Sequence, residues 1–235
     1  MSLRYLVFLL LLILYAPGAV SAEVFVHDSV AFSREEILIK AETKKGYFAK
    51  GGQVVEFSVN GKSIGSVLSG GDGIAYKIFK TGRVGMYTVT VKSGRDTGNG
   101  YIMVLNKGSK IVFVDVEGSL LAAPFAKKPV ESSRRTIRKI MDKYPLVYLH
   151  FGDIGIKEVR GWLNQNRFPV SAVLPWKMGD VFAELDKKGF TIKAVLGSQV
   201  VIGSSDAYKP MVFSFDEQSS SSHLRKWQEI EKKLR

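Results

Sequence analysis

The feature that most constrains the fold is a short apolar run that ends on an acidic pair. Residues 111–114, Ile-Val-Phe-Val, are too few for a buried helix and rich in β-branched side chains, so they predict a parallel strand covered on both faces. Asp115 ends the run, Glu117 follows two positions later, and Gly118 allows a sharp turn. Ligands of open α/β sheets bind at this end of the strands. The acidic pair predicts a ligand-binding site or, as the simpler alternative, side chains that cap the following turn.

The chain after this strand alternates between helical and strand patterns. Helices are expected over residues 130–144, 156–166 and 179–188, and strands over 146–151, 170–174, 192–196 and 211–215. This alternation predicts right-handed crossovers and a parallel sheet with helices on both sides. A last helix, 219–234, carries an apolar stripe that favours a docked helix over one lying on a membrane surface. The stripe consists of Leu224, Trp227, Ile230 and Leu234.

The chain before the central strand has a period of two. Val55, Phe57 and Val59 alternate with polar residues, and Asn60-Gly61 is a hairpin signal. Further strands are expected at 74–79, 85–91 and 101–105, with a glycine-rich turn over 93–100. This spacing predicts a small antiparallel β-sandwich. The stretch Gly85-x-Tyr87-x-Val89-x-Val91 resembles the penultimate strand of bacterial immunoglobulin-like modules, and this resemblance implies that Tyr87 holds the sandwich corner.

The start of the chain has the pattern of an export signal. Arg4 is followed by an apolar run over residues 5–16, a Pro-Gly break and the small residues Val20-Ser21-Ala22. A spanning helix needs about 20 apolar residues, so a cleaved peptide is favoured over a retained anchor. The expected organisation is a signal peptide (1–22), a sandwich (23–105), a linker (106–109), an α/β domain (110–218) and a terminal helix (219–235). The mature protein is expected to be periplasmic or extracellular, without a transmembrane segment.

Composition limits the classes of function. Lys plus Arg number 34 against 22 Asp plus Glu, a formal net charge of +12, which favours anionic surroundings such as phospholipid head groups. The basic residues are spread along the chain, so no strong nucleic-acid signal is present. The absence of cysteine excludes disulfides, thiolate nucleophiles and cysteine metal sites. Lys44 and Lys45 beside Tyr47 and Phe48 suggest either an anion contact or a solvated turn.

The second domain resembles the haloacid dehalogenase (HAD) superfamily of phosphotransferases, in particular its small lipin-like members without a cap domain. The residues that carry the resemblance are Asp115-Val116-Glu117-Gly118-Ser119-Leu120, similar to the family's D-x-D-G-T-L, and the strand ending at His150. The resemblance implies a three-layer, Rossmann-like α/β fold. Only about ten residues, 120–129, separate the first strand from the first helix, which leaves no room for an inserted cap, so an open site is expected.

The resemblance also assigns catalytic roles. Asp115 would attack phosphorus and form an aspartyl-phosphate, and Glu117 would protonate the leaving oxygen, although the family has the shorter aspartate there. His150 stands where the family has a Ser or Thr that binds the phosphoryl group. Lys177 fits the family's charge-neutralising lysine by position, and Lys193 is the alternative.

Metal binding is the largest departure from the family pattern. The resemblance implies Mg²⁺ held at Asp115 and Glu117 together with late aspartates, of which only Asp206 remains as a candidate. Gly197-Ser198 stands at the other expected aspartate. Asp206 can equally cap a short helix.

Three interpretations of function follow. The first is an exported, non-catalytic protein whose degenerate HAD-like domain binds an anionic ligand, such as a phospholipid head group, or a protein partner. The second is a magnesium-dependent phosphatase, a HAD-type phosphoric-ester hydrolase acting on a phospholipid or another large phosphorylated substrate. The third is a structural cell-envelope protein. The sequence leaves the presence of enzyme activity open.

Overall fold

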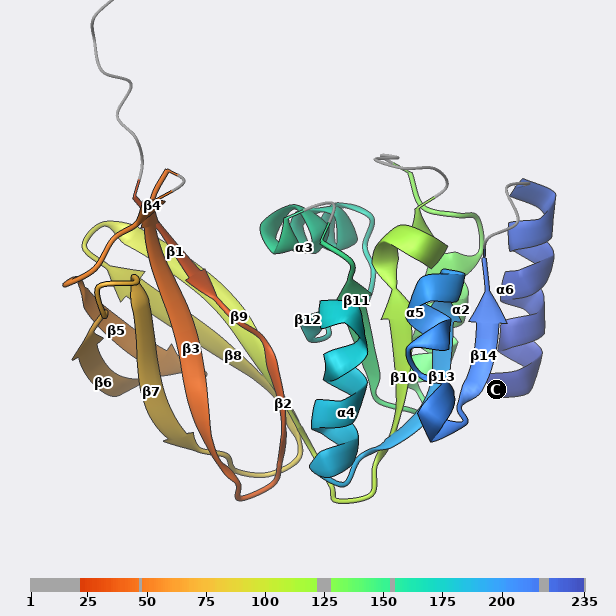
Figure 1. Ribbon diagram of the computed structural model, residues 1–235, viewed down its shortest axis with the longest axis horizontal. Coiled ribbons are helices and arrows are strands. Elements are labelled where there is room, and N and C mark those ends of the chain that lie inside the picture. Colours follow the sequence, from red (N-terminus) through yellow and green to blue (C-terminus); the bar gives the residue numbers. More distant parts are fainter. Residues whose placement is uncertain (1–21, 47, 122–127, 153–154, 216–219, 235) are drawn as a thin grey trace, which may run out of the picture.

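The computed structural model describes residues 22–46, 48–121, 128–152, 155–215 and 220–234. They form a β-sandwich followed by a parallel sheet with helices on both faces (Figure 1). Residues 1–21, which hold most of the predicted signal peptide, and residues 122–127, in the segment expected to lack a cap, lie outside the described ranges. In the described part of the chain, no helix combines the length and the apolar character needed to cross a membrane.

Two sheets form the sandwich. In the first, β3 (Glu36–Lys45) pairs with β1 (Ala22–Val26), β4 (Phe48–Ala49) and β7 (Ile74–Lys80). In the second, the order is β2 (Ser29–Phe32), β9 (Asp96–Leu105), β8 (Gly85–Ser93), β5 (Val54–Val59) and β6 (Lys62–Leu68). Val55, Phe57 and Val59 are buried in the core between the sheets, as their alternation predicts. The sandwich is not purely antiparallel, because β2 pairs with β9 in parallel.

The strand order is immunoglobulin-like. With immunoglobulin labels, β1, β3 and β7 are strands A, B and E of one sheet, and β5, β8 and β9 are strands C, F and G of the other, extended by β6. Tyr87, near the start of β8, donates a hydrogen bond from its hydroxyl to the carbonyl of Arg83 at 2.8 Å. This is the contact of a tyrosine corner. The predicted immunoglobulin-like sandwich is therefore supported at the level of the fold.

The predicted turn over residues 93–100 is wrong. β8 continues to Ser93 and β9 begins at Asp96, so the turn is confined to Gly94 and Arg95. Gly98 and Gly100, which suggested a longer turn, lie inside β9 where β1 passes close to it. A Cβ atom on Gly100 would lie 2.7 Å from Cγ1 of Val26. Glycine here indicates close backbone approach rather than a turn.

The sheet that follows the sandwich has five strands, and all of them are parallel. Their order is β12 (Val173–Pro175), β11 (Leu146–His150), β10 (Lys110–Asp115), β13 (Thr191–Gly197) and β14 (Met211–Ser214). The apolar run 111–114 is buried on both faces, which confirms the expected central strand. If these strands are numbered along the chain from β10, their order in the sheet is 3-2-1-4-5. The chain therefore runs outward in one direction from β10 and in the other direction from β13, and the switch point lies between these two strands.

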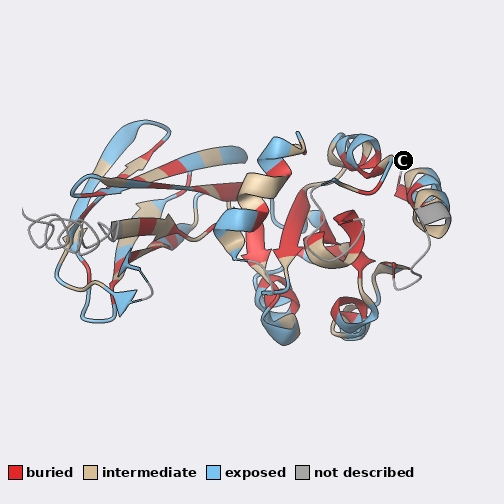
Figure 2. Ribbon diagram, turned by 90° about the horizontal axis from the view of Figure 1, so that it is seen from above, coloured by how far each residue is buried: buried red, intermediate tan, exposed pale blue. Residues whose placement is uncertain are grey.

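Helices cover both faces of this sheet (Figure 2). α2 (Ser133–Met141), α3 (Ile156–Gln165) and α6 (Ser220–Leu234) share one apolar cluster with the sheet. α4 (Asp180–Lys187) and α5 (Gln199–Gly203) share the opposite cluster, which also takes in Val30 and Leu105 of the sandwich. The short α5 was not foreseen from the sequence. In α6 the side chains of Trp227, Ile230 and Leu234 are buried, so this helix is docked.

Candidate functional site

Asp115 lies at the carboxyl edge of the sheet, between the ends of β10 and β13. One turn of π-helix, η1 (Val116–Leu120), follows it directly. Oδ1 of Asp115 accepts a hydrogen bond from the Gly118 N–H at 2.9 Å. Its Oδ2 accepts from the Ser198 N–H at 3.1 Å and from the Ser198 hydroxyl at 3.0 Å. The carboxylate thus joins the π-turn after β10 to the end of β13, at the switch point where such sheets bind ligands.

The surroundings of Asp115 are closed. Only 1% of its surface is exposed. A Cβ atom on Gly197 would lie 2.5 Å from Cβ of Asp115, and one on Gly118 would lie 2.7 Å from the Ser198 nitrogen. The two glycines therefore let backbone pack directly against the carboxylate. In this geometry Asp115 is a fixed hydrogen-bond acceptor with little access from solvent.

Glu117 is the chemically unusual group of the edge. Both of its carboxylate oxygens are buried and have no hydrogen-bond partner in the described part of the chain. Burial raises the pKa of Glu117 to about 7, and the charge of Asp115 adds to the rise, while backbone groups at Phe151 and Gly152 oppose it. Burial disfavours the charged form because ionised oxygens lose their hydration. The pKa of Glu117 is thus raised into the neutral range.

His150 ends β11 at the same edge and is half-buried. Its backbone carbonyl accepts a hydrogen bond from the Trp176 N–H at 3.0 Å. Trp176 stacks on Phe151, with ring centroids 4.7 Å apart, and donates from its indole N–H to the Ser204 hydroxyl at 2.9 Å. The aromatic pair is the part of this edge that sequence reasoning missed. No periodicity marks Phe151 or Trp176, since both follow a strand end.

The two candidate lysines, Lys177 and Lys193, contact residues other than Asp115 and Glu117. Lys177 Nζ lies 3.6 Å from Glu184 Oε1 on α4. It lines a cavity of about 270 Å³ between α4 and the β1–β2 connection, together with Lys40 and Lys188. Lys193 lies over the ring of Tyr144, 5.8 Å from its centroid, before the start of β11. Lys177 therefore lies at the domain junction and Lys193 near the amino end of the strands.

The candidate ligands for a metal ion lie apart from one another. Asp206 begins the short 3₁₀ helix η3 (Asp206–Tyr208) and is exposed. In the described ranges no three His, Cys, Asp or Glu side chains come close enough to hold a metal. Both oxygens of Asp115 already accept N–H or O–H donors. These residues therefore do not fit a Mg²⁺ ion held jointly by Asp115, Glu117 and Asp206.

A cluster of exposed arginines lies on α2 and on the turn after α3. Arg134 donates to the Asn166 carbonyl at 3.3 Å, and Arg138 donates to the Arg167 carbonyl at 3.1 Å. Arg135 is exposed beside them. Within the described residues, none of the four arginines forms an ion pair with a carboxylate. We call Arg134, Arg135, Arg138 and Arg167 the arginine face.

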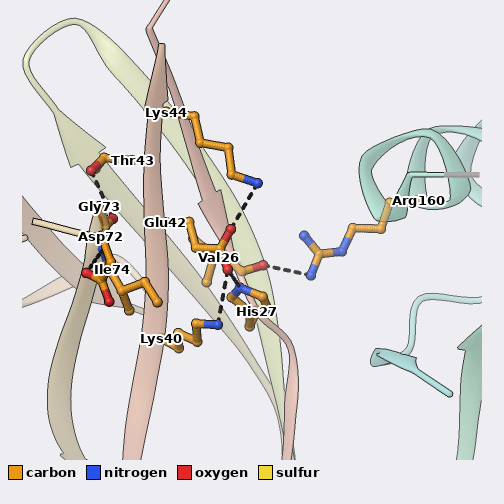
Figure 3. Close-up of polar contacts among 10 residues, drawn as sticks. All are labelled: Val26, His27, Lys40, Glu42, Thr43, Lys44, Asp72, Gly73, Ile74 and Arg160. Carbon is orange, nitrogen blue, oxygen red and sulfur yellow. Dashed lines mark hydrogen bonds and ion pairs between the residues drawn. The ribbon is translucent and has the colours of Figure 1, made fainter. Parts of the chain in front are cut away.

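The junction between the sandwich and the parallel sheet includes buried polar contacts beside its apolar ones. Arg160 on α3 donates to the Val26 carbonyl at 2.9 Å (Figure 3). The same guanidinium pairs with Asp28. Beside it on the sandwich, Glu42 contacts His27 at 2.7 Å, Lys40 at 3.1 Å and Lys44 at 3.0 Å. Burial alone would raise the pKa of Glu42, but hydrogen bonds from Lys44, Lys40 and His27 hold it at about 2.

Comparisons with known proteins give a likeness to small β-sandwich domains. No protein-family description matches this sequence, and no curated protein matches it significantly. An IG27 protein domain is 12% identical with a TM-score of 0.30, covering 37% of this chain and 95% of that one. The D00-D0 domain of intimin is 18% identical with a TM-score of 0.33, covering 39% and 52%. A CARDB domain from Pyrococcus furiosus is 14% identical with a TM-score of 0.29, covering 37% and 93%. At these scores no functional conclusion follows.

Proposed function

We propose that this is an exported, non-catalytic binding protein that holds an anionic partner on its arginine face. The supporting observation is that Arg134, Arg135, Arg138 and Arg167 expose guanidinium groups without carboxylate partners. A guanidinium binds phosphate or carboxylate oxygens with two parallel hydrogen bonds, which suits a phospholipid head group or another polyanion. The HAD-like domain then acts as the scaffold that presents this face.

The state of Asp115 supports a scaffold role for the acidic pair. A nucleophilic carboxylate needs an open approach to phosphorus, whereas Asp115 is 1% exposed and accepts three protein hydrogen bonds. The candidate lysine, Lys177, is paired with Glu184. A phosphate dianion beside Asp115 and Glu117 would therefore meet negative charge without a compensating cation among these residues.

The binding test compares two charge-matched variants. Arg134→Ala with Arg138→Ala removes two cations from the arginine face, and Lys62→Ala with Lys92→Ala removes two exposed cations from the sandwich. The protein is mixed with vesicles of neutral lipid carrying a fraction of anionic lipid, and in parallel with a soluble polyanion. We expect at least a tenfold weaker, salt-dependent affinity only for the arginine variant. Equal binding by both variants would refute the arginine face, and no binding at all would favour the structural interpretation.

A phosphatase is the second candidate, and Glu117 is the observation that favours it. A carboxyl with a pKa of about 7 is suited to protonate a leaving oxygen near neutral pH, and Glu117 stands two residues after Asp115. In this alternative Asp115 attacks phosphorus, the ester bond breaks, and Glu117 gives its proton to the departing alkoxide. Hydrolysis of a phosphoric ester with and without Mg²⁺, measured beside Asp115→Asn, separates the candidates. Turnover lost in that variant would replace our proposal.

A further inference from the structure

The outer edge of β7 has the properties of a strand-pairing surface. β7 pairs with β3 on one side, and no other strand in the described part of the chain pairs with it. Figure 1 shows β7 on the part of the sandwich that is remote from the parallel sheet. Its pairing with β3 is regular from Glu42↔Ile74 to Glu36↔Lys80, without a bulge. By contrast, the edge strand β6 carries a register shift and Gly65 in the left-handed region, which blunt an edge.

The backbone groups at this edge can be assigned from the ladder. The Gly73 carbonyl and the Thr81 N–H both bond to the β3 side, at Thr43 and Glu35. Since the direction alternates along an antiparallel strand, residues 75, 77 and 79 face β3, and residues 74, 76, 78 and 80 face outward. Ile74 agrees with this, because its carbonyl accepts from the Gly70 N–H and its N–H donates to Asp72. Tyr76, Ile78 and Lys80 therefore present outward-facing backbone groups.

The side chains beside this edge are apolar and exposed. Tyr76 is 51% exposed and Ile78 is 60% exposed. Leu38 lies opposite Ile78 on β3 and is also 60% exposed. An exposed apolar group beside an unpaired, regular strand edge is a template for pairing with a strand of another chain.

We propose that β7 pairs antiparallel with β7 of a second copy of this chain, about a two-fold axis at Ile78. In this register Ile78 faces Ile78 of the second copy, and Tyr76 faces its Lys80, so all three residues use their outward N–H and C=O groups. A continuous apolar row Leu38, Ile78, Ile78, Leu38 then crosses four strands. Each Lys80 lies between Glu36 of its own sheet and Tyr76 of the other copy. Cross-strand pairs of oppositely charged or apolar side chains stabilise a sheet.

Neighbouring two-fold registers are less favourable, so the axis at Ile78 is the register expected for a second copy. An axis at Lys77 would set two ammonium groups directly opposite each other, which is destabilising. An axis at Tyr76 would need the Ile74 backbone, which is already bonded within the 70–74 turn. The strand is thus self-complementary in the way that an isologous interface requires.

The first test measures mass against concentration. The purified full chain is followed by sedimentation equilibrium and light scattering from about 1 to 500 µM, the range expected for a small interface. We expect a shift from monomer to dimer for the natural protein. Ile78→Pro should abolish it without unfolding, because proline is tolerated where an edge N–H faces solvent. Val200→Lys on α5, where Val200 is 58% exposed, serves as the control and should still dimerise. A monomer at all concentrations, or a dimer unaffected by Ile78→Pro, would overturn the proposal.

The second test fixes the register. The chain has no cysteine, so one introduced thiol reports on one position. In Ile78→Cys the two Cα atoms would be about 5.5 Å apart, which suits a disulfide. In Tyr76→Cys they would be four residues apart along the ladder, too far to join. We expect oxidation to give covalent dimers of the first variant only. Equal cross-linking of both would show non-specific association and contradict the register.

Discussion

Arg160 on α3 and Asp28 in the sandwich form a buried ion pair across the domain junction, with Nη2 and Oδ1 2.6 Å apart. The Asp28 side chain is fully buried and also accepts hydrogen bonds from the Tyr101 N–H at 2.5 Å and the Val173 N–H at 2.8 Å. Val173 begins β12, so a sandwich carboxylate bonds the backbone at the edge of the parallel sheet. The relative orientation of the two parts is therefore set by this pair as well as by the short linker.

Removing the Arg160 guanidinium should lower the free energy of unfolding. In Arg160→Met the Asp28 carboxylate stays buried without its cation, and breaking one partner of such a pair costs about 3 kcal/mol. Asp28→Asn with Arg160→Met removes both charges and should cost less than Arg160→Met alone. Urea unfolding of the three proteins gives the free energies. A double variant destabilised as much as Arg160→Met, or more, would contradict this account.

The Asp28–Arg160 pair could not be predicted from the sequence. The partners are 132 positions apart, and neither lies in a pattern that marks burial. Local patterns did predict the central strand at residues 111–114, the alternation on β5 and the docked stripe of α6, because burial on one or both faces leaves a period in the sequence. The glycines of β9 were misread because close strand approach and turns require the same residue.

The sequence pattern predicted only the part of the candidate site that directly follows a buried strand. The position of Asp115 and Glu117 at a strand end follows from the apolar run before them. The contact of Asp115 with Ser198 spans two strands that are neighbours only in the folded sheet. Lys177 was chosen by position along the chain. Its Nζ lies near Glu184, and the backbone of Lys177 and Met178 is left-handed, with φ values of 49° and 53°. No sequence period encodes such a backbone.

The tyrosine corner gives a second prediction. Tyr87→Phe removes the hydroxyl that donates to the Arg83 carbonyl and should lower the free energy of unfolding by about 1 kcal/mol. Tyr76→Phe removes the same atom from a half-exposed side chain for which no hydrogen bond is described and should change it by less than about 0.5 kcal/mol. Thermal or urea unfolding of both variants checks the difference. Equal effects would mean that the corner contact contributes nothing to the sandwich.

Glu117 predicts a pH dependence of stability. Burial raises its pKa from 4.5 to about 7 in the folded protein, so the folded state binds more protons than the unfolded state between these values. The contribution of Glu117 is therefore complete below about pH 4.5 and is lost as the pH rises towards 7. Partial solvation reduces the full effect, and we expect a loss of about 2 kcal/mol.

Glu117→Gln isolates this contribution, because glutamine does not titrate. Relative to the natural protein, the variant should gain about 2 kcal/mol of stability between pH 5 and pH 8. Urea unfolding at pH 5, 6, 7 and 8 measures the gain. Glu184→Gln, which alters an exposed carboxylate, is the matched control and should show no such trend. A constant difference between Glu117→Gln and the natural protein across this range would exclude the raised pKa.

The packing of backbone against Asp115 gives the last prediction. Gly197→Ala places a methyl group 2.5 Å from Cβ of Asp115, and Gly197 does not lie in the left-handed region, so the clash is the main effect. Since the neighbours are a strand and a buried carboxylate, the site cannot relax freely, and we expect a loss of about 3 kcal/mol. Gly161→Ala in α3 meets no atom within 4 Å and should stabilise the helix by up to about 1 kcal/mol. If Gly197→Ala were instead tolerated as well as Gly161→Ala, the edge would be open enough to admit a ligand at Asp115. Asp115 would then not be a fixed, enclosed acceptor, and this result would contradict the non-catalytic proposal.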